Sequence, residues 1–294
     1  MPELPEVEHV VRALRRYLTG RRIIAAEVTL KKLIAPAAPS TFTQKLRDST
    51  IAGVSRRGKF ILLALNRPDT PVQSATRIPH SAIGRLTLVV HLRMTGRFLY
   101  LSPDDDLPKY AHAIFHLDND RRLVFRDQRQ FGVMKLVTGA RLSKTKGIRD
   151  LAPEPLSDDF SADYLKQVLG NSKRTLKTLL LDQTRVVGLG NIYAAEALFR
   201  AGINPFKTAC ELSAPRTARL HQAIRDVLSE ATSEGSTSRL SLENPNGFSY
   251  GDAFESFWQV YDREGEPCFR CRARIRRITH AGRSTYWCPR CQRR

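Results

Sequence analysis

The chain has 294 residues, enough for two domains with their own hydrophobic cores. Its 48 Lys and Arg residues outnumber its 29 Asp and Glu residues, and the resulting net charge of +19 makes nucleic acid the leading candidate partner. No apolar run reaches the roughly 18 residues of a membrane span, and no signal peptide is evident. We therefore expect an intracellular protein that is not secreted, whose cysteines bind metal or stay free.

The first residues combine a helix with an unusual chemical group at its start. Residues 5–19 have apolar side chains at helical spacing. Removal of Met1 would leave Pro2 with a free secondary amine, which titrates at about pH 8 and is partly nucleophilic at neutral pH. Glu3 beside it is a candidate acid or base. The alternative is a chain end with no role.

The rest of the first half has the pattern of a β-rich domain. Short alternating or β-rich runs predict strands at 23–30, 50–55, 60–65, 86–92, 96–101, 113–117, 123–125 and 133–137. With the first helix packed against them, these strands predict a β-sandwich. A polar stretch that contains prolines predicts a surface loop at 66–84.

The pattern becomes helical near residue 150. Helices are predicted at about 158–169, 173–182, 192–201 and 214–233. The turn Val186–Asn191 separates two of them, and Tyr193 stands where a dinucleotide fingerprint would have its third glycine. This turn suits a DNA phosphate at the start of the following helix, or it is an ordinary interhelical turn, and the spacing favours neither.

The C-terminal segment has the spacing of a four-thiolate zinc site. Two C-x₂-C pairs, separated by 16 residues, are formed by Cys268, Cys271, Cys288 and Cys291. A redox or disulfide role is the alternative. With four protein ligands the zinc would be structural, and nine arginines with no acid in 268–294 indicate contact with phosphates. The fifth cysteine, Cys210, is most simply a buried small apolar residue.

Three landmarks together resemble one protein family over nearly the whole chain. They are the start MPELPEVE, the segment Leu180–Phe199 and the four-cysteine finger, with further support from Pro153–Phe160. In these features the chain resembles the bacterial formamidopyrimidine-DNA glycosylases. The resemblance implies an α+β multidomain fold with a catalytic β-sandwich and packed helix at 1–140, a helix–two-turns–helix DNA-binding domain at 150–234, and a lesion-capping region with a zinc finger at 235–294. It also implies one structural Zn²⁺.

The activity implied by the resemblance is that of a bifunctional enzyme of base-excision repair. It would remove oxidised purines (8-oxoguanine and formamidopyrimidines) from duplex DNA and cut the strand by β,δ-elimination through an imine on the terminal proline. Its partner would be duplex DNA with oxidised bases or abasic sites, bound by a monomer in the cytoplasm at the nucleoid. The alternatives are an endonuclease VIII-like glycosylase for oxidised pyrimidines, a non-catalytic binder of damaged DNA, and an RNA-binding zinc-ribbon protein.

Site residues follow from the same resemblance, position by position. The implied catalytic residues are Pro2, Glu3, Glu6 and Lys59. The implied DNA contacts are the phosphate ligands His91, Asn191, Tyr261 and Arg283 and the wedge residues Met94, Arg129 and Phe131, which would fill the hole left by the flipped base. Several of these residues have a plainer alternative: a helix N-terminal acid for Glu6, a solvated charge for Lys59, and core packing for the histidine, the tyrosine and the apolar wedge residues.

Two segments depart from the family pattern. Where the family usually has Asp-Pro-Arg-Arg-Phe-Gly, this chain has Asp127-Gln128-Arg129-Gln130-Phe131-Gly132, without the proline and one arginine. The stretch Gly235–Phe257 also departs from the usual glycine- and threonine-rich pattern that caps an oxidised guanine. These departures bear on wedge geometry and on lesion choice.

Overall fold

A computed structural model describes residues 1–67, 86–233, 242–243 and 258–293. The predicted loop at 66–84 and the segment Gly235–Phe257 lie largely outside the described residues. The chain divides into two compact units. The first holds the described residues within 1–2, 6–149 and 239–250, and the second holds those within 3–5, 150–238 and 251–294.

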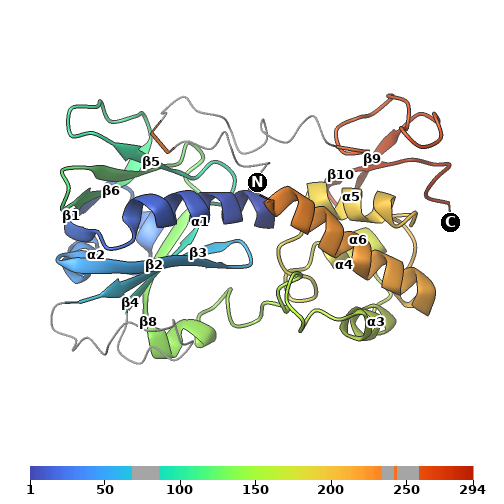
Figure 1. The fold of residues 1–294 in the computed structure, drawn as a ribbon, viewed down its shortest axis with the longest axis horizontal. Helices are drawn as coiled ribbons and strands as arrows, with labels where there is room; N and C mark the ends of the chain where they lie inside the picture. The colour runs from blue at the N-terminus through green and yellow to red at the C-terminus, as the bar shows by residue number, and fades with distance from the viewer. Residues whose placement is uncertain (68–85, 234–241, 244–257, 294) are drawn as a thin grey trace. The chain divides into compact units, whose positions relative to one another are not determined.

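Helices and strands follow the predicted order with small shifts at their ends (Figure 1). The α-helices are α1 (Leu4–Leu18), α2 (Pro39–Leu46), α3 (Ala162–Gly170), α4 (Leu176–Leu180), α5 (Asn191–Arg200) and α6 (Ala214–Thr232). The 3₁₀ turns are η1 (Lys31–Ile34), η2 (Gly139–Lys144) and η3 (Ala209–Glu211). The strands are β1 (Arg22–Val28), β2 (Ser49–Arg57), β3 (Phe60–Asn66), β4 (Leu86–His91), β5 (Arg97–Leu101), β6 (Ala111–Leu117), β7 (Arg122–Arg126), β8 (Val133–Thr138), β9 (Arg276–His280) and β10 (Arg283–Trp287).

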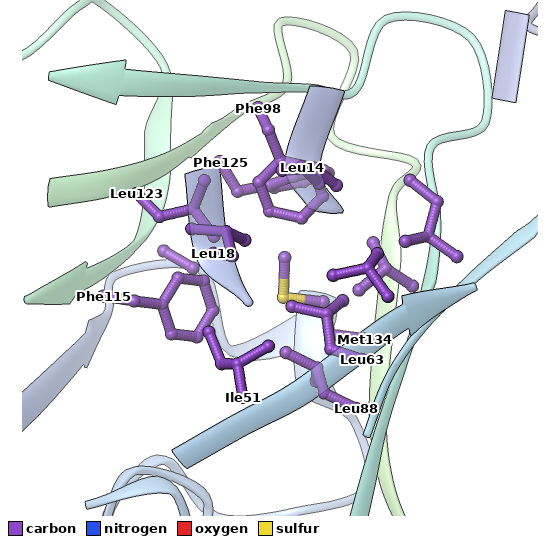
Figure 2. Packing of buried hydrophobic residues seen from close by; sticks show 14 of the residues in the cluster. Leu14, Leu18, Ile51, Leu63, Leu88, Phe98, Phe115, Leu123, Phe125 and Met134 are labelled. Atoms are coloured by element: carbon purple, nitrogen blue, oxygen red, sulfur yellow. The ribbon is translucent and has the colours of Figure 1, made fainter. Parts of the chain in front are cut away.

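The first unit is built on one antiparallel sheet that encloses its own core. The strand order is β5-β7-β6-β1-β2-β3-β4-β8, and β1 and β2 are joined by only two residue pairs. Side chains from both halves of the sheet belong to one buried cluster, which Figure 2 shows with Phe115 and Phe125 from one half near Leu63 and Met134 from the other. The predicted sandwich is therefore a single sheet whose two halves share a core.

Helix α1 completes this core because its apolar residues recur at helical spacing. Val7, Val10, Val11, Leu14 and Leu18 are all at most 1% exposed. The sequence analysis missed α2, which is only eight residues long and buries one apolar pair, Phe42 and Leu46. So short an apolar pattern is weak evidence for a helix.

The second unit packs α3, α4, α5 and α6 around a separate core, to which Leu4 belongs. Helix α5 is its centre, since every residue from Tyr193 to Phe199 is buried. The prediction that Cys210 is buried was wrong, because it lies exposed in η3. Among the described helices, none has the length and apolarity that a membrane span requires.

Candidate functional site

The start of the chain carries the first candidate catalytic residues. Met1 is 45% exposed, whereas Pro2, the predicted nucleophile, is buried. Glu6, in the first turn of α1, is 4% exposed. Burial of a carboxylate in a first helical turn is compatible with a dipole role and with a catalytic one.

Glu3 is held at the start of α5 within the second unit. Its carboxylate accepts hydrogen bonds from the backbone amides of Gly190 at 2.5 Å, Ile192 at 2.9 Å and Tyr193 at 3.3 Å. These amides would otherwise be unpaired, and the helix start favours a negative charge. A Cβ on Gly190 would collide with the carboxyl group, which explains a glycine at this position.

This arrangement corrects one reading of the turn at Val186–Asn191. The turn was considered as a phosphate site made by amides at the next helix start, but those amides bind the Glu3 carboxylate instead. The glycine residue Gly188, with φ of +87°, lets the turn pass over Leu4, whose amide donates to the Gly188 carbonyl at 3.1 Å. The turn therefore anchors the N-terminal residues to the second unit.

The first unit brings Lys59 and His91 together. Phe60, next to Lys59, pairs with His91 across β3 and β4, and the two rings meet edge to face at 4.7 Å. Burial, followed by the charges of Arg93 and Lys59, lowers the pKa of His91 to about 3. The backbone amide of Arg93 donates to His91 Nδ1 at 3.0 Å, so the neutral ring carries its hydrogen on Nε2. His91 can thus offer an N–H donor beside two cations.

The three wedge candidates lie on two neighbouring loops of the first unit. Met94 is 40% exposed and Phe131 is 52% exposed, so neither is a core residue. The Arg129 guanidinium lies 5.1 Å from the centre of the Phe131 ring, within the range of a cation–π contact. Large apolar side chains left in water at adjacent loops are typical of a binding surface.

Asn191, Tyr261 and Arg283 meet around the β9–β10 hairpin of the second unit. Asn191 Nδ2 donates to the Ser284 carbonyl at 2.9 Å, and Arg283 is the exposed neighbour of Ser284. Burial raises the pKa of the Tyr261 phenol against a hydrogen bond from Asn191, so the phenol keeps its proton and can donate it. The Tyr261 hydroxyl and the Arg283 guanidinium are donors suited to an anion, and Asn191 holds the phenol and the Ser284 carbonyl beside them.

Two buried charged residues, which no sequence motif had indicated, hold the elements that carry Asn191, Tyr261 and Arg283 in place. Lys177, 1% exposed, donates from Nζ to the Ser284 carbonyl at 2.6 Å and to Thr285 Oγ1 at 2.9 Å. Burial, then the charge of Arg283, lowers its pKa to about 8, although Glu3 acts in the opposite direction. The only signal in the sequence was a lysine inside the apolar run 176–180.

The second missed residue is Glu196 on α5. Its carboxylate accepts hydrogen bonds from three consecutive amides, those of Gln259, Val260 and Tyr261, at 2.8–3.0 Å. Burial raises the pKa of Glu196 against these bonds. The Glu3 carboxylate therefore caps the start of α5, and the Glu196 carboxylate of the same helix holds the segment that carries Tyr261.

The four predicted zinc ligands converge. Their sulfur atoms all lie within 4.8 Å of one another, with Cys271 and Cys288 at 3.4 Å and Cys268 and Cys291 at 3.9 Å. These distances exclude disulfide bonds, which need about 2.05 Å. A tetrahedron with Zn–S bonds of about 2.3 Å has edges of roughly 3.8 Å. The cluster is therefore the site of one structural zinc ion, which joins the loop before β9 to the end of β10.

Comparisons with known proteins cover the whole chain. Models of the formamidopyrimidine-DNA glycosylase N-terminal domain, of the H2TH domain of the same enzymes, and of a zinc finger found in them and in isoleucyl-tRNA synthetase match residues 1–134, 151–241 and 265–294. A formamidopyrimidine-DNA glycosylase from Pelotomaculum thermopropionicum is 42% identical over 100% of this chain and 99% of its own length. One from Phenylobacterium zucineum is 43% identical over the full length of both chains.

Solved structures agree with the sequence relatives. A MutM complex with DNA that contains carbocyclic 8-oxo-G has a TM-score of 0.85 and 32% identity, covering 100% of both chains. The Lactococcus lactis enzyme with N7-benzyl-Fapy-dG DNA has a TM-score of 0.86 and 31% identity, again over 100% of both chains. The chain thus belongs to the formamidopyrimidine-DNA glycosylase family and is a DNA glycosylase and abasic-site lyase.

Proposed function

We propose that this enzyme removes oxidised purines from duplex DNA and cuts the strand by successive β- and δ-elimination at Pro2. The substrate class rests on the full-length likeness to enzymes solved with 8-oxoguanine and formamidopyrimidine analogues. It would act as a monomer on chromosomal DNA in the cytoplasm, at the nucleoid. The chain would divide into three functional parts: a catalytic part at 1–140, a helical DNA-binding part at 150–234, and a lesion-capping and finger part at 235–294.

The observation that supports this mechanism is that the Glu3 carboxylate, one residue after Pro2, is held in a fixed position. Three amide hydrogen bonds fix the direction of this carboxylate at the start of α5. A fixed carboxylate next to an amine is suited to proton transfer to the ring oxygen that is bonded to the carbon the amine attacks. Glu6 follows in the first turn of the same helix as a second carboxylate.

The chemistry proceeds in balanced steps from these residues. The Pro2 nitrogen forms a bond to C1′ as the bond from C1′ to the base breaks, and the base leaves with the proton that the Pro2 nitrogen gives up. Proton transfer through Glu3 opens the sugar ring and gives a cationic imine between Pro2 and C1′. The imine makes the neighbouring C2′ proton acidic. Loss of that proton expels the 3′ phosphate, and a second elimination expels the 5′ phosphate.

DNA binding would divide between two sets of residues. In the first unit, Lys59 and the neutral His91 would contact a phosphate, while Met94, Arg129 and Phe131 would fill the space of the flipped base. In the second unit, Asn191, Tyr261 and Arg283 would bind the DNA backbone. Lys177 would hold the hairpin that carries Arg283 through its hydrogen bond to the Ser284 carbonyl. The zinc ion would keep the hairpin that carries Arg283 folded.

Borohydride trapping tests this proposal directly, because reduction of the imine leaves a covalent protein–DNA adduct. We expect an adduct on duplexes with 8-oxoguanine or an abasic site once mass spectrometry shows that Met1 is absent. Pro2→Gly replaces the secondary amine by a primary one and should slow both base excision and strand cleavage, whereas Pro103→Gly, at an exposed loop position, should behave as the unchanged enzyme. Trapping only on an oxidised pyrimidine would instead assign the enzyme to endonuclease VIII-like substrates.

A further inference from the structure

Two loops of the first unit carry the wedge candidates and are connected to each other by one buried carboxylate. Met94 and Thr95 lie between β4 and β5, whereas Asp127 and Phe131 lie between β7 and β8. Asp127 is only 1% exposed, in contrast to the exposed wedge side chains beside it. A buried carboxylate must be fully hydrogen-bonded to be tolerated, so its partners show what it holds.

The Asp127 carboxylate bonds to both loops. The Thr95 hydroxyl donates to Oδ1, and the Gly132 amide donates to Oδ2 at 2.7 Å. The Thr95 hydroxyl oxygen in turn accepts from the Arg129 amide at 3.0 Å. Thr95 therefore uses its hydroxyl as donor and acceptor at once, and it connects the loop that carries Met94 to the start of the loop that carries Phe131, while the second oxygen of Asp127 reaches the end of that loop at Gly132.

The backbone of Asp127 fixes the turn itself. Its carbonyl oxygen accepts from the Gln130 amide at 3.2 Å and lies 3.0 Å from His112 Nε2 on β6. Gln130 has φ of +57°, in the left-handed region that non-glycine residues rarely adopt. Neither Gln128 nor Gln130 restricts the backbone as a proline would, so the hydrogen bonds of Asp127 supply the restraint.

Close packing under the loops removes the remaining freedom. A Cβ on Gly96 would lie 2.8 Å from the Phe125 ring, and a Cβ on Gly132 would lie 2.7 Å from it. Both glycines thus rest on the same aromatic ring, which Figure 2 shows inside the core. The two loops therefore pack on one aromatic ring, Phe125, and are also connected by the hydrogen bonds of Asp127.

We propose that Asp127 and Thr95 are positioning residues that lock the two loops into one unit, so that Met94, Arg129 and Phe131 enter the duplex together. This proposal rests on the proposed wedge role of those three residues. Extrusion of a stacked base costs free energy, and a wedge that is ordered before it binds loses less free energy to its own ordering and so offsets more of that cost. A mobile pair of loops would lose that advantage, whereas a reaction that needs no extrusion would not depend on it.

The test compares two reactions of the same protein. Single-turnover base excision from an 8-oxoguanine duplex needs extrusion, while strand cleavage at a preformed abasic site has no base to extrude. Thr95→Val keeps the shape of the side chain but removes the hydroxyl. We expect it to slow excision at least about tenfold, the effect of one lost hydrogen bond to a carboxylate, while abasic cleavage changes less than about twofold. Thr95→Ser, which keeps the hydroxyl, should retain both rates.

Control variants separate the possible failures. Asp127→Asn should repeat the split between the two reactions, and Phe131→Ala should slow excision as a direct test of the wedge. Normal excision by Thr95→Val together with slow excision by Phe131→Ala would overturn the locking role and leave the wedge intact. Normal excision by Phe131→Ala would overturn both. Equal slowing of both reactions by Thr95→Val would also contradict the proposal, and adduct formation at Pro2 tests the proposed function separately.

Discussion

The three hydrogen bonds that the Glu3 carboxylate accepts at the start of α5 allow a quantitative prediction about the free energy of unfolding. In Glu3→Gln one carboxylate oxygen becomes an NH₂ group, which faces a backbone N–H instead of accepting from it. One of the three amide hydrogen bonds is lost outright and the other two lose their charge. Hydrogen bonds to charged groups contribute about 1.5–3 kcal/mol each, and neutral ones about 1 kcal/mol. We therefore expect a loss of at least about 2.5 kcal/mol in the free energy of unfolding of the second unit.

The assay follows from the position of the two tryptophans. Trp258 and Trp287 are the only ones in the chain and both belong to the second unit, so their fluorescence reports its unfolding. A domain of this size loses roughly 2–4 °C of Tm per kcal/mol, so Tm should fall by at least about 5 °C. Gly190→Ala should shift Tm in the same direction, because its Cβ would displace the Glu3 carboxyl group.

A matched control is Glu211→Gln in the same unit. Glu211 pairs with Lys207 at 3.5 Å on the surface, with its side chain 59% exposed, so its loss should cost at most about 0.5 kcal/mol. A Tm for Glu3→Gln no lower than that of this control would refute the reasoning that the three amide bonds hold the N-terminal residues to α5.

Three further predictions concern the second unit. Arg283→Ala should reduce the slope of log affinity against log salt by about one, measured by DNA titration at several salt concentrations, while Arg219→Ala on the exposed face of α6 should leave it unchanged. Metal analysis should find one zinc ion per chain. The Cys288→Ser variant should lose this zinc, and the control Cys210→Ser should keep it. Full DNA affinity in the metal-free protein would contradict a structural role for the zinc. The pKa of Lys177 is about 8 in the folded state, below its ordinary value of 10.5 in the unfolded state. Between about pH 8 and pH 10.5 the unfolded state therefore binds more protons than the folded state, so the free energy of unfolding should rise with pH in this range. Denaturant titrations should show that Lys177→Met lacks this rise, and an identical pH dependence in both proteins would count against burial of the lysine.

The sequence determined the elements whose signal is local. The apolar spacing of α1, the alternation along the strands and the two C-x₂-C pairs each depend on residues close together in the chain, so pattern and spacing were sufficient. The basic hairpin and the family resemblance came from the same local information. The short helix α2 was missed because one buried pair does not make a periodic pattern.

What only the tertiary structure decided is which distant groups meet. No local pattern indicates that the Glu3 carboxylate caps a helix that begins at residue 191, that Lys177 donates to the Ser284 carbonyl, or that Asp127 holds Thr95. These contacts exist because a buried charge must find partners wherever the fold brings them, and the fold depends on the packing of the whole core. The sequence by itself therefore indicated the chemistry and the metal ligands, while the packed fold decided how the reactive residues are oriented.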